Sequence, residues 1–126
     1  MMTVAVRWQK LEGLAVFIAG LLAYDRLDGN WWVFLGLFLA PDLSMLAYAI
    51  NARVGAFAYN LAHSLTLPLV LMATGFALAN QACVLGALIW ISHIGFDRAL
   101  GYGLKSPLGF DLTSMGRIGK AARAEQ

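Results

Sequence analysis

Four side chains of the types that bind metal ions stand inside long apolar stretches of the sequence: Asp42, His63, His93 and Asp97. A neutral histidine nitrogen and an aspartate oxygen suit zinc, manganese or iron. A water molecule in an open coordination position ionises near neutral pH and can then attack a hydrolysable bond. These residue types therefore indicate a candidate site for a divalent metal ion, with hydrolysis as the chemistry it could perform.

Further polar residues in the same stretches could support these ligands. Asn60, Ser64, Ser92 and Arg98 are expected to orient the four side chains by hydrogen bonds, as the outer partners of metal ligands commonly do. Arg98 could instead neutralise the neighbouring Asp97, contact a lipid phosphate or extend to the membrane surface.

The same residues are compatible with two other interpretations. Buried Asp and His side chains can pair with each other and with Asn60, which would hold helices together or relay protons without catalysis. A proton relay across the whole membrane is disfavoured, because the apolar stretch that contains His63 has few polar side chains after it, namely Ser64, Thr66 and Thr74. His63 and His93 could also be axial ligands of haem, but haem needs an apolar slot and two aspartates stand at this site.

The amino-acid composition indicates the class of protein in which these residues lie. The chain has 126 residues, of which 60% are hydrophobic and 13% charged, and its mean hydropathy is +0.70. A soluble domain of this size could not bury so much apolar surface, and a disordered chain would be far more polar. A net charge of +2 without a basic stripe argues against nucleic-acid binding, and the single Cys83 cannot form an intrachain disulfide. The sequence therefore predicts a small integral membrane protein.

Four apolar stretches, at about 8–26, 31–50, 54–79 and 82–100, predict an all-α, up-and-down bundle of four membrane-spanning helices in a single domain. The first stretch runs from about Leu11 to Tyr24 and is short for a span unless it extends back through Trp8, which would place Glu12 near the membrane surface. Turn signals at 28–30, 51–53 and 80–81 separate the stretches. Pro41 is expected to kink the second helix. The Gly-rich, basic segment 101–126 is expected to leave the membrane as an irregular tail.

The distribution of lysine and arginine predicts the orientation, because these residues are retained on the cytoplasmic side. Both termini and the loop at Arg53 share one side, which carries eight of the nine basic residues, whereas Arg26 alone lies on the other side. At about 1.5 Å of rise per residue, Asp42, His63 and His93 lie about 10–13 Å from the cytoplasmic ends of their helices. Asp97 lies one turn beyond His93 on the same face. Four candidate ligands on three helices are therefore expected in one layer.

Several motifs of the chain resemble a family of short bacterial membrane proteins, that of domain of unknown function 4260. The motifs are Leu11-Glu12-Gly13, Ala40-Pro41-Asp42-Leu43-Ser44, Tyr59-Asn60-Leu61-Ala62-His63 and the run from Ser92 to Lys105. The resemblance implies a four-helix, multi-pass protein of the bacterial inner membrane, without an established activity. It also implies that Glu12, Arg98, Tyr102, Gly103 and Lys105 belong to the family pattern. We expect Arg98, Tyr102 and Lys105 to contact a substrate or a lipid headgroup.

A second set of motifs is similar to membrane-bound metal-dependent hydrolases, in which Pro-Asp, Thr-His-Ser and Ser-His-x-x-x-Asp follow in this order. By this likeness Asp42, His63, His93 and Asp97 would be metal ligands. The chain departs from the pattern at Ser44, where a second Asp followed by His is usual, and it lacks the His-Arg that precedes Thr-His-Ser. The expected function is a metal-dependent hydrolase that acts on a lipid-linked or amphipathic substrate at the cytoplasmic leaflet. The alternative is a non-enzymatic membrane protein with a buried Asp/His network. Membrane lipid is the expected partner, and the sequence allows a homo-oligomer.

Overall fold

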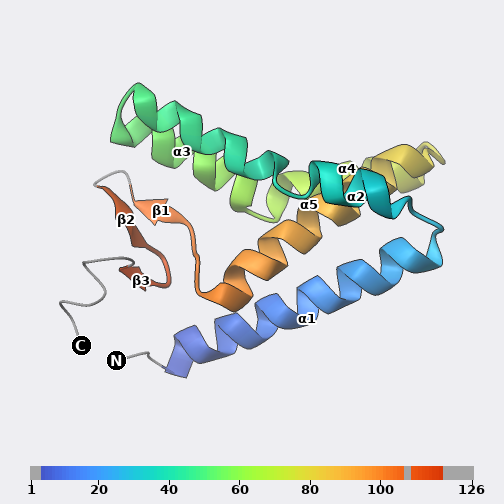
Figure 1. The fold of residues 1–126 in the computed structure, drawn as a ribbon, viewed down its shortest axis with the longest axis horizontal. Helices are drawn as coiled ribbons and strands as arrows, with labels where there is room; N and C mark the ends of the chain where they lie inside the picture. The colour runs from blue at the N-terminus through green and yellow to red at the C-terminus, as the bar shows by residue number, and fades with distance from the viewer. Residues whose placement is uncertain (1–3, 107–108, 118–126) are drawn as a thin grey trace.

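The computed structural model describes residues 4–106 and 109–117, in which the chain runs up and down the molecule four times (Figure 1). The passes are, in order, α1 (Val4–Arg26), α2 (Trp31–Leu37) with the 3₁₀ helix η1 (Ala40–Ala49), α3 (Ala52–His63) with α4 (Thr66–Ala77), and α5 (Gln81–Leu100). Each pass lies antiparallel to the one before it (Figure 1). The predicted four-helix, up-and-down architecture is confirmed.

Three of the four passes are long and apolar enough to cross a membrane: Trp31–Ala49, Ala52–Ala77 and Gln81–Leu100. Large hydrophobic side chains cover the outside of these passes, which is the surface that lipid hydrocarbon contacts in a bilayer. α1 differs from these three spans because it has charged residues near both of its ends. Its 23 residues nevertheless measure about 34 Å along the helix axis. A hydrocarbon core of about 30 Å fits within that length. The fold is therefore that of a membrane protein whose first pass has charged ends.

Two of the passes are broken near the middle, and a proline accounts for each break. Proline lacks an N–H and its ring clashes with the carbonyl four residues earlier. Pro41 has this effect on Leu37, where α2 ends and beyond which the chain continues as η1. Pro68 has the same effect on Ser64, which is extended (ψ 155°) directly after α3 ends. The break at Pro41 agrees with the expected kink, whereas the division of the third apolar stretch was not foreseen.

An asparagine caps the helix that follows each predicted turn. The side-chain oxygens of Asn30, Asn51 and Asn80 accept hydrogen bonds from backbone N–H groups in the first turns of α2, α3 and α5. These bonds satisfy donors that have no partner inside the helix. The turn signals of the sequence thus act as helix starts, and they fix where each pass begins.

α1 and α5 pack with their backbones in close contact. A Cβ atom built on Gly95 would lie 2.6 Å from the backbone nitrogen of Phe17 and 2.8 Å from the carbonyl oxygen of Gly13. Gly20 approaches the side chain of Ser92 one turn further along the same interface. Small residues allow such close packing between membrane helices, where van der Waals contacts drive association. This interface holds α5, which carries two of the candidate ligands, against the first pass.

The segment after α5 forms a small antiparallel sheet instead of an irregular tail. Its strands are β1 (Lys105–Ser106), β2 (Gly109–Thr113) and β3 (Gly116–Arg117), in that order. The Asn60 amide fastens the sheet to α3, because its oxygen accepts from the Lys105 N–H (2.6 Å) and its nitrogen donates to the Lys105 carbonyl (2.9 Å). The expectation of an irregular tail is wrong for 105–106 and 109–117, and the strands were missed because strands this short show no periodic pattern. The rest of the tail, 118–126, lies outside the described residues.

The start of α1 and the sheet lie at the same end of the bundle, as an even number of passes requires (Figure 1). From the charge bias we expect this end to face the cytoplasm. A phosphatase reporter that is active only outside the cytoplasm, fused after Gln126, should therefore give no signal, while the same reporter placed in the 28–30 turn should be active. A strong signal from the C-terminal fusion would reverse the orientation.

Candidate metal centre

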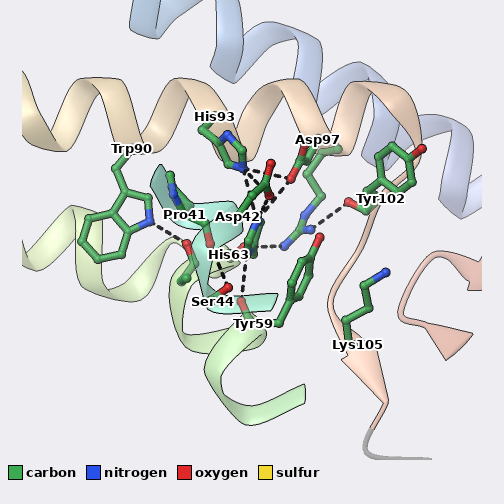
Figure 2. A network of polar contacts seen from close by, with 12 residues as sticks. Pro41, Asp42, Ser44, Tyr59, His63, Trp90, His93, Asp97, Tyr102 and Lys105 are labelled. Carbon is green, nitrogen blue, oxygen red and sulfur yellow. Dashed lines mark hydrogen bonds and ion pairs between the residues drawn. The ribbon is translucent and has the colours of Figure 1, made fainter. Parts of the chain in front are cut away.

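The structure brings the four predicted ligands together from three passes of the bundle (Figure 2). Asp42 lies in the first turn of η1, His63 is the last residue of α3, and His93 and Asp97 lie one turn apart on α5. One ligand atom from each residue lies within 4.8 Å of the other three. Asp42 and His63 stand directly beside the two helix breaks, so the breaks allow both side chains to reach α5.

The donor atoms are spaced as the ligands of a tetrahedral metal ion are spaced. His63 Nε2 lies 3.0 Å from Asp42 Oδ1, 3.2 Å from His93 Nε2 and 3.4 Å from Asp97 Oδ2. His93 Nε2 lies 3.2 Å from each of the same two carboxylate oxygens. In a tetrahedron with ligands about 2.0–2.1 Å from the ion, neighbouring ligands are about 3.3–3.4 Å apart. Five of the six distances between the four ligand atoms are therefore close to those expected around a zinc-sized cation.

The tautomer of His63 supports the same conclusion. Its Nδ1 lies 2.9 Å from the Tyr59 carbonyl oxygen, and because a carbonyl only accepts, Nδ1 must carry the proton and donate it. In the neutral ring, Nε2 then presents a lone pair toward the Asp42 carboxylate, which repels it unless a cation lies between them. A backbone carbonyl that fixes the tautomer in this way is the usual outer partner of a metal-binding histidine.

The charge of the cluster also favours a divalent cation. Two carboxylates and two neutral imidazoles carry a charge of about −2, which is costly inside a membrane. Protonating both histidines would balance this charge, but it would leave two N–H groups facing each other across the 3.2 Å between the Nε2 atoms. A single divalent ion balances the two carboxylates without that clash. The four residues thus could hold a metal ion, in agreement with the sequence-based prediction.

Neighbouring side chains hold both imidazoles in place. The Tyr59 ring stacks on His63 with its centroid 3.8 Å away and an interplanar angle of 8°, and Phe38 contacts the His93 ring edge to face at 5.3 Å. Both histidines are almost completely buried, whereas the side chain of Asp42 is 32% exposed and that of Asp97 13%. The centre is therefore closed on the histidine side and accessible on the side of Asp42.

Two side chains of α5 donate hydrogen bonds to the C-terminal end of α3, where the third pass is broken. The last carbonyls of a helix have no partner within it. The Trp90 indole N–H donates to the Ala62 carbonyl (2.5 Å), and the Arg98 guanidinium donates to the carbonyls of His63 (3.1 Å) and Tyr102 (3.0 Å). These bonds position His63 relative to the α5 ligands. Trp90 was not predicted to have this role, although its place one turn before His93 is a signal that could have suggested it.

The other residues expected near the ligands occupy different positions. Asn60 binds β1, Ser64 forms the break between α3 and α4, and Ser92 is buried against Gly20 of α1, where its hydroxyl has no hydrogen-bond partner among the described residues. Of the expected supporting residues, Arg98 is the one that bonds directly to a ligand residue, through the His63 carbonyl.

Two of the residues expected to contact a substrate or headgroup, Tyr102 and Lys105, lie on the side of the ligands where α5 ends and β1 begins (Figure 2). Tyr102 is 41% exposed, whereas Lys105 is only 4% exposed and its Nζ lies 5.0 Å from the centroid of the Tyr59 ring. The ammonium group is therefore placed over the ring that stacks on His63. This cation–π contact links β1 to the metal centre.

The comparisons with known proteins identify the family but not an activity. A search of the curated proteins and a search of the solved structures gave no significant match. The family model described as "Domain of unknown function (DUF4260)" matches residues 6–118. That range contains nearly all of α1, the other three passes, the sheet and the four candidate ligands. The chain therefore belongs to the DUF4260 family, and the Asp/His centre lies within the part of the chain that the family shares.

Proposed function

We propose that this protein is a membrane-embedded, metal-dependent hydrolase that acts on a lipid-linked or amphipathic substrate at the cytoplasmic leaflet. The observation that carries the proposal is the uneven burial of the four ligands. Two nearly inaccessible histidines would hold the ion, while the 32% exposed side chain of Asp42 lies where a substrate can approach. Catalytic metal sites differ from structural ones in keeping one position accessible in this way.

The residues of the site can supply what hydrolysis requires. A bound divalent cation would supply Lewis acidity and lower the pKa of a coordinated water. Hydrolysis adds water across the scissile bond: its oxygen joins the acyl or phosphoryl centre and its two protons pass to the products. Asp42, as the most accessible carboxylate, would accept the first proton and return it to the leaving oxygen. The nearby Arg98 guanidinium provides positive charge beside Asp97, where negative charge on the substrate would be stabilised.

A second function is favoured by the number of ligands. Four protein ligands in a tetrahedron are typical of structural zinc sites, whereas catalytic zinc usually has three. In that case the ion would fasten η1, α3 and α5 together at the helix breaks. The two functions differ in whether an external ligand can enter the coordination sphere.

Cobalt substitution can separate these two functions without knowledge of the substrate. We expect the visible absorption spectrum of the Co²⁺-loaded protein in detergent micelles to change when azide is added, because azide would displace or join the Asp42 carboxylate. Asp42→Ala should respond at a lower azide concentration. A wild-type spectrum that azide leaves unchanged would contradict the hydrolase proposal and favour a sealed, structural ion.

A further inference from the structure

A groove with a volume of about 360 Å³ lies beside the metal centre, in the gap that the two helix breaks open against α5. We call it the Gly86 groove, and its lining residues are Leu37, Ala40, Pro41, Ser44, Ala62, Gly86, Ile89 and Trp90. All of them belong to the three passes that are apolar enough to cross a membrane. The groove therefore opens at a depth where hydrocarbon surrounds the protein, and its volume is that of a small-molecule site.

The lining of the Gly86 groove suits a hydrocarbon chain better than a polar ligand. It contains no charged side chain. Its two side chains with hydrogen-bond donors use them within the protein: the Trp90 indole donates to the Ala62 carbonyl and the Ser44 hydroxyl donates to the Pro41 carbonyl (2.8 Å). A ligand that needs hydrogen bonds would lose them on entering, whereas an alkyl chain has none to lose.

The residues that line the groove are neighbours of the candidate ligands on each wall. Gly86, Trp90, His93 and Asp97 follow at intervals of four, three and four residues, so they share one face of α5. On the opposite walls, Pro41 and Ala62 directly precede the ligands Asp42 and His63. Figure 2 shows Trp90 and Pro41 on one side of the ligand cluster and Tyr102 and Lys105 on the other. The α5 wall of the groove runs from Gly86 to Trp90, about 6 Å along the helix, and His93 follows about one turn later.

We propose that the Gly86 groove binds one acyl chain of a membrane lipid, which places the bond that joins the chain to the headgroup at the metal centre. This inference rests on the proposed function for what happens at the metal, but the binding of the chain does not depend on it. The substrate would then be an acyl lipid that enters sideways from the bilayer, with its polar part toward Arg98 and Tyr102.

Gly86 offers a means of blocking the groove. A Cβ atom at Gly86 would meet no atom within 4 Å, and the same holds for Gly36, which lies on α2 outside the groove. Gly86→Leu should therefore fill the groove without disturbing the fold, and Gly36→Leu is the matched control. Ala40→Leu, which intrudes from η1, serves as a second blocking variant. The metal content of each variant reports whether the centre has folded.

The test uses the full chain in vesicles of phosphatidylethanolamine and phosphatidylglycerol that contain a little phosphatidylcholine with a diazirine near the end of one acyl chain. After illumination, mass spectrometry locates the adducts. In the wild type and in Gly36→Leu we expect adducts on groove residues to exceed those on lipid-facing residues such as Leu46 and Phe57. In Gly86→Leu and Ala40→Leu the groove adducts should fall at least tenfold, with the other adducts unchanged.

The inference is overturned if the blocking variants are labelled in the groove as strongly as the wild type, or if wild-type labelling follows surface exposure alone. Its failure is distinguishable from that of the proposed function. Labelling that behaves as expected while azide leaves the Co²⁺ spectrum unchanged would retain the lipid site and reject the hydrolase. The reverse result would retain an accessible metal and reject the acyl site.

Discussion

The His93→Ala variant should purify with almost no bound metal while the bundle stays folded. Each of the five short distances within the ligand cluster involves one of the two histidines, so His93 is central to the tetrahedron. Loss of a residue that merely supports a ligand costs about 10–100-fold in metal affinity, so loss of a ligand should cost more than 100-fold. Most association between membrane helices comes from packing along their length, which His93→Ala leaves in place.

Metal content per chain and thermal unfolding, with and without added zinc, measure this effect. At a free zinc concentration of 100 times Kd, binding to the folded state stabilises the wild type by about 2.7 kcal/mol, and the variant should gain almost nothing. Ser92→Ala is the matched control, because the buried Ser92 hydroxyl lies on the α1 side of the same helix. If wild type and His93→Ala carried equal, near-zero metal after purification without a chelator, the Asp/His cluster would be a packing network.

Gly95→Val should lower the free energy of unfolding by about 3 kcal/mol, at the upper end of the usual cost of overpacking. The atoms that a Cβ at Gly95 would meet are the backbone nitrogen of Phe17 and the carbonyl oxygen of Gly13, so no flexible side chain can move aside. The two helices would have to separate. Since α5 also carries His93 and Asp97, the variant should bind metal more weakly as well.

Reversible unfolding of the reconstituted protein in sodium dodecyl sulfate, followed by circular dichroism, measures the first effect. Gly36→Val is the control, because a Cβ at Gly36 meets nothing within 4 Å and the helix-propensity cost of valine is shared by both variants. Equal stability of Gly95→Val and Gly36→Val would show that the close backbone contact between α1 and α5 does not exist in the membrane.

The sequence alone predicted the four passes and the layer of ligands for identifiable reasons. Uninterrupted apolar stretches and asparagine-containing turns define where each pass begins and ends. The i, i+4 spacing of His93 and Asp97 defines a shared helical face. Counting residues from the helix ends gave similar depths for Asp42 and His63, and the two residues do meet the α5 pair. This estimate succeeded although both helices are broken, because each ligand lies next to its break.

Features that depend on distant contacts could not be predicted in this way. The Asn60–Lys105 pair joins residues 45 positions apart, and no local pattern indicates which side chain will bind a later strand. Ser92 has the depth of the ligands but faces α1, because adjacent residues of a helix point in directions about 100° apart. The break at Ser64 arises from Pro68, which lies four residues further on. The preference of proline for the first turn of a helix does not by itself reveal that an apolar stretch is divided there.

X-ray absorption at the zinc edge of the wild-type protein, loaded with one equivalent of zinc, tests the central claim most directly. Zinc bound by Asp42, His63, His93 and Asp97 should show four nitrogen or oxygen neighbours at about 2.0–2.1 Å, with the outer-shell scattering of two imidazole rings. A sulfur neighbour at about 2.3 Å, which Cys83 would supply, or a shell without imidazole, would contradict the assignment of the metal centre to these four residues.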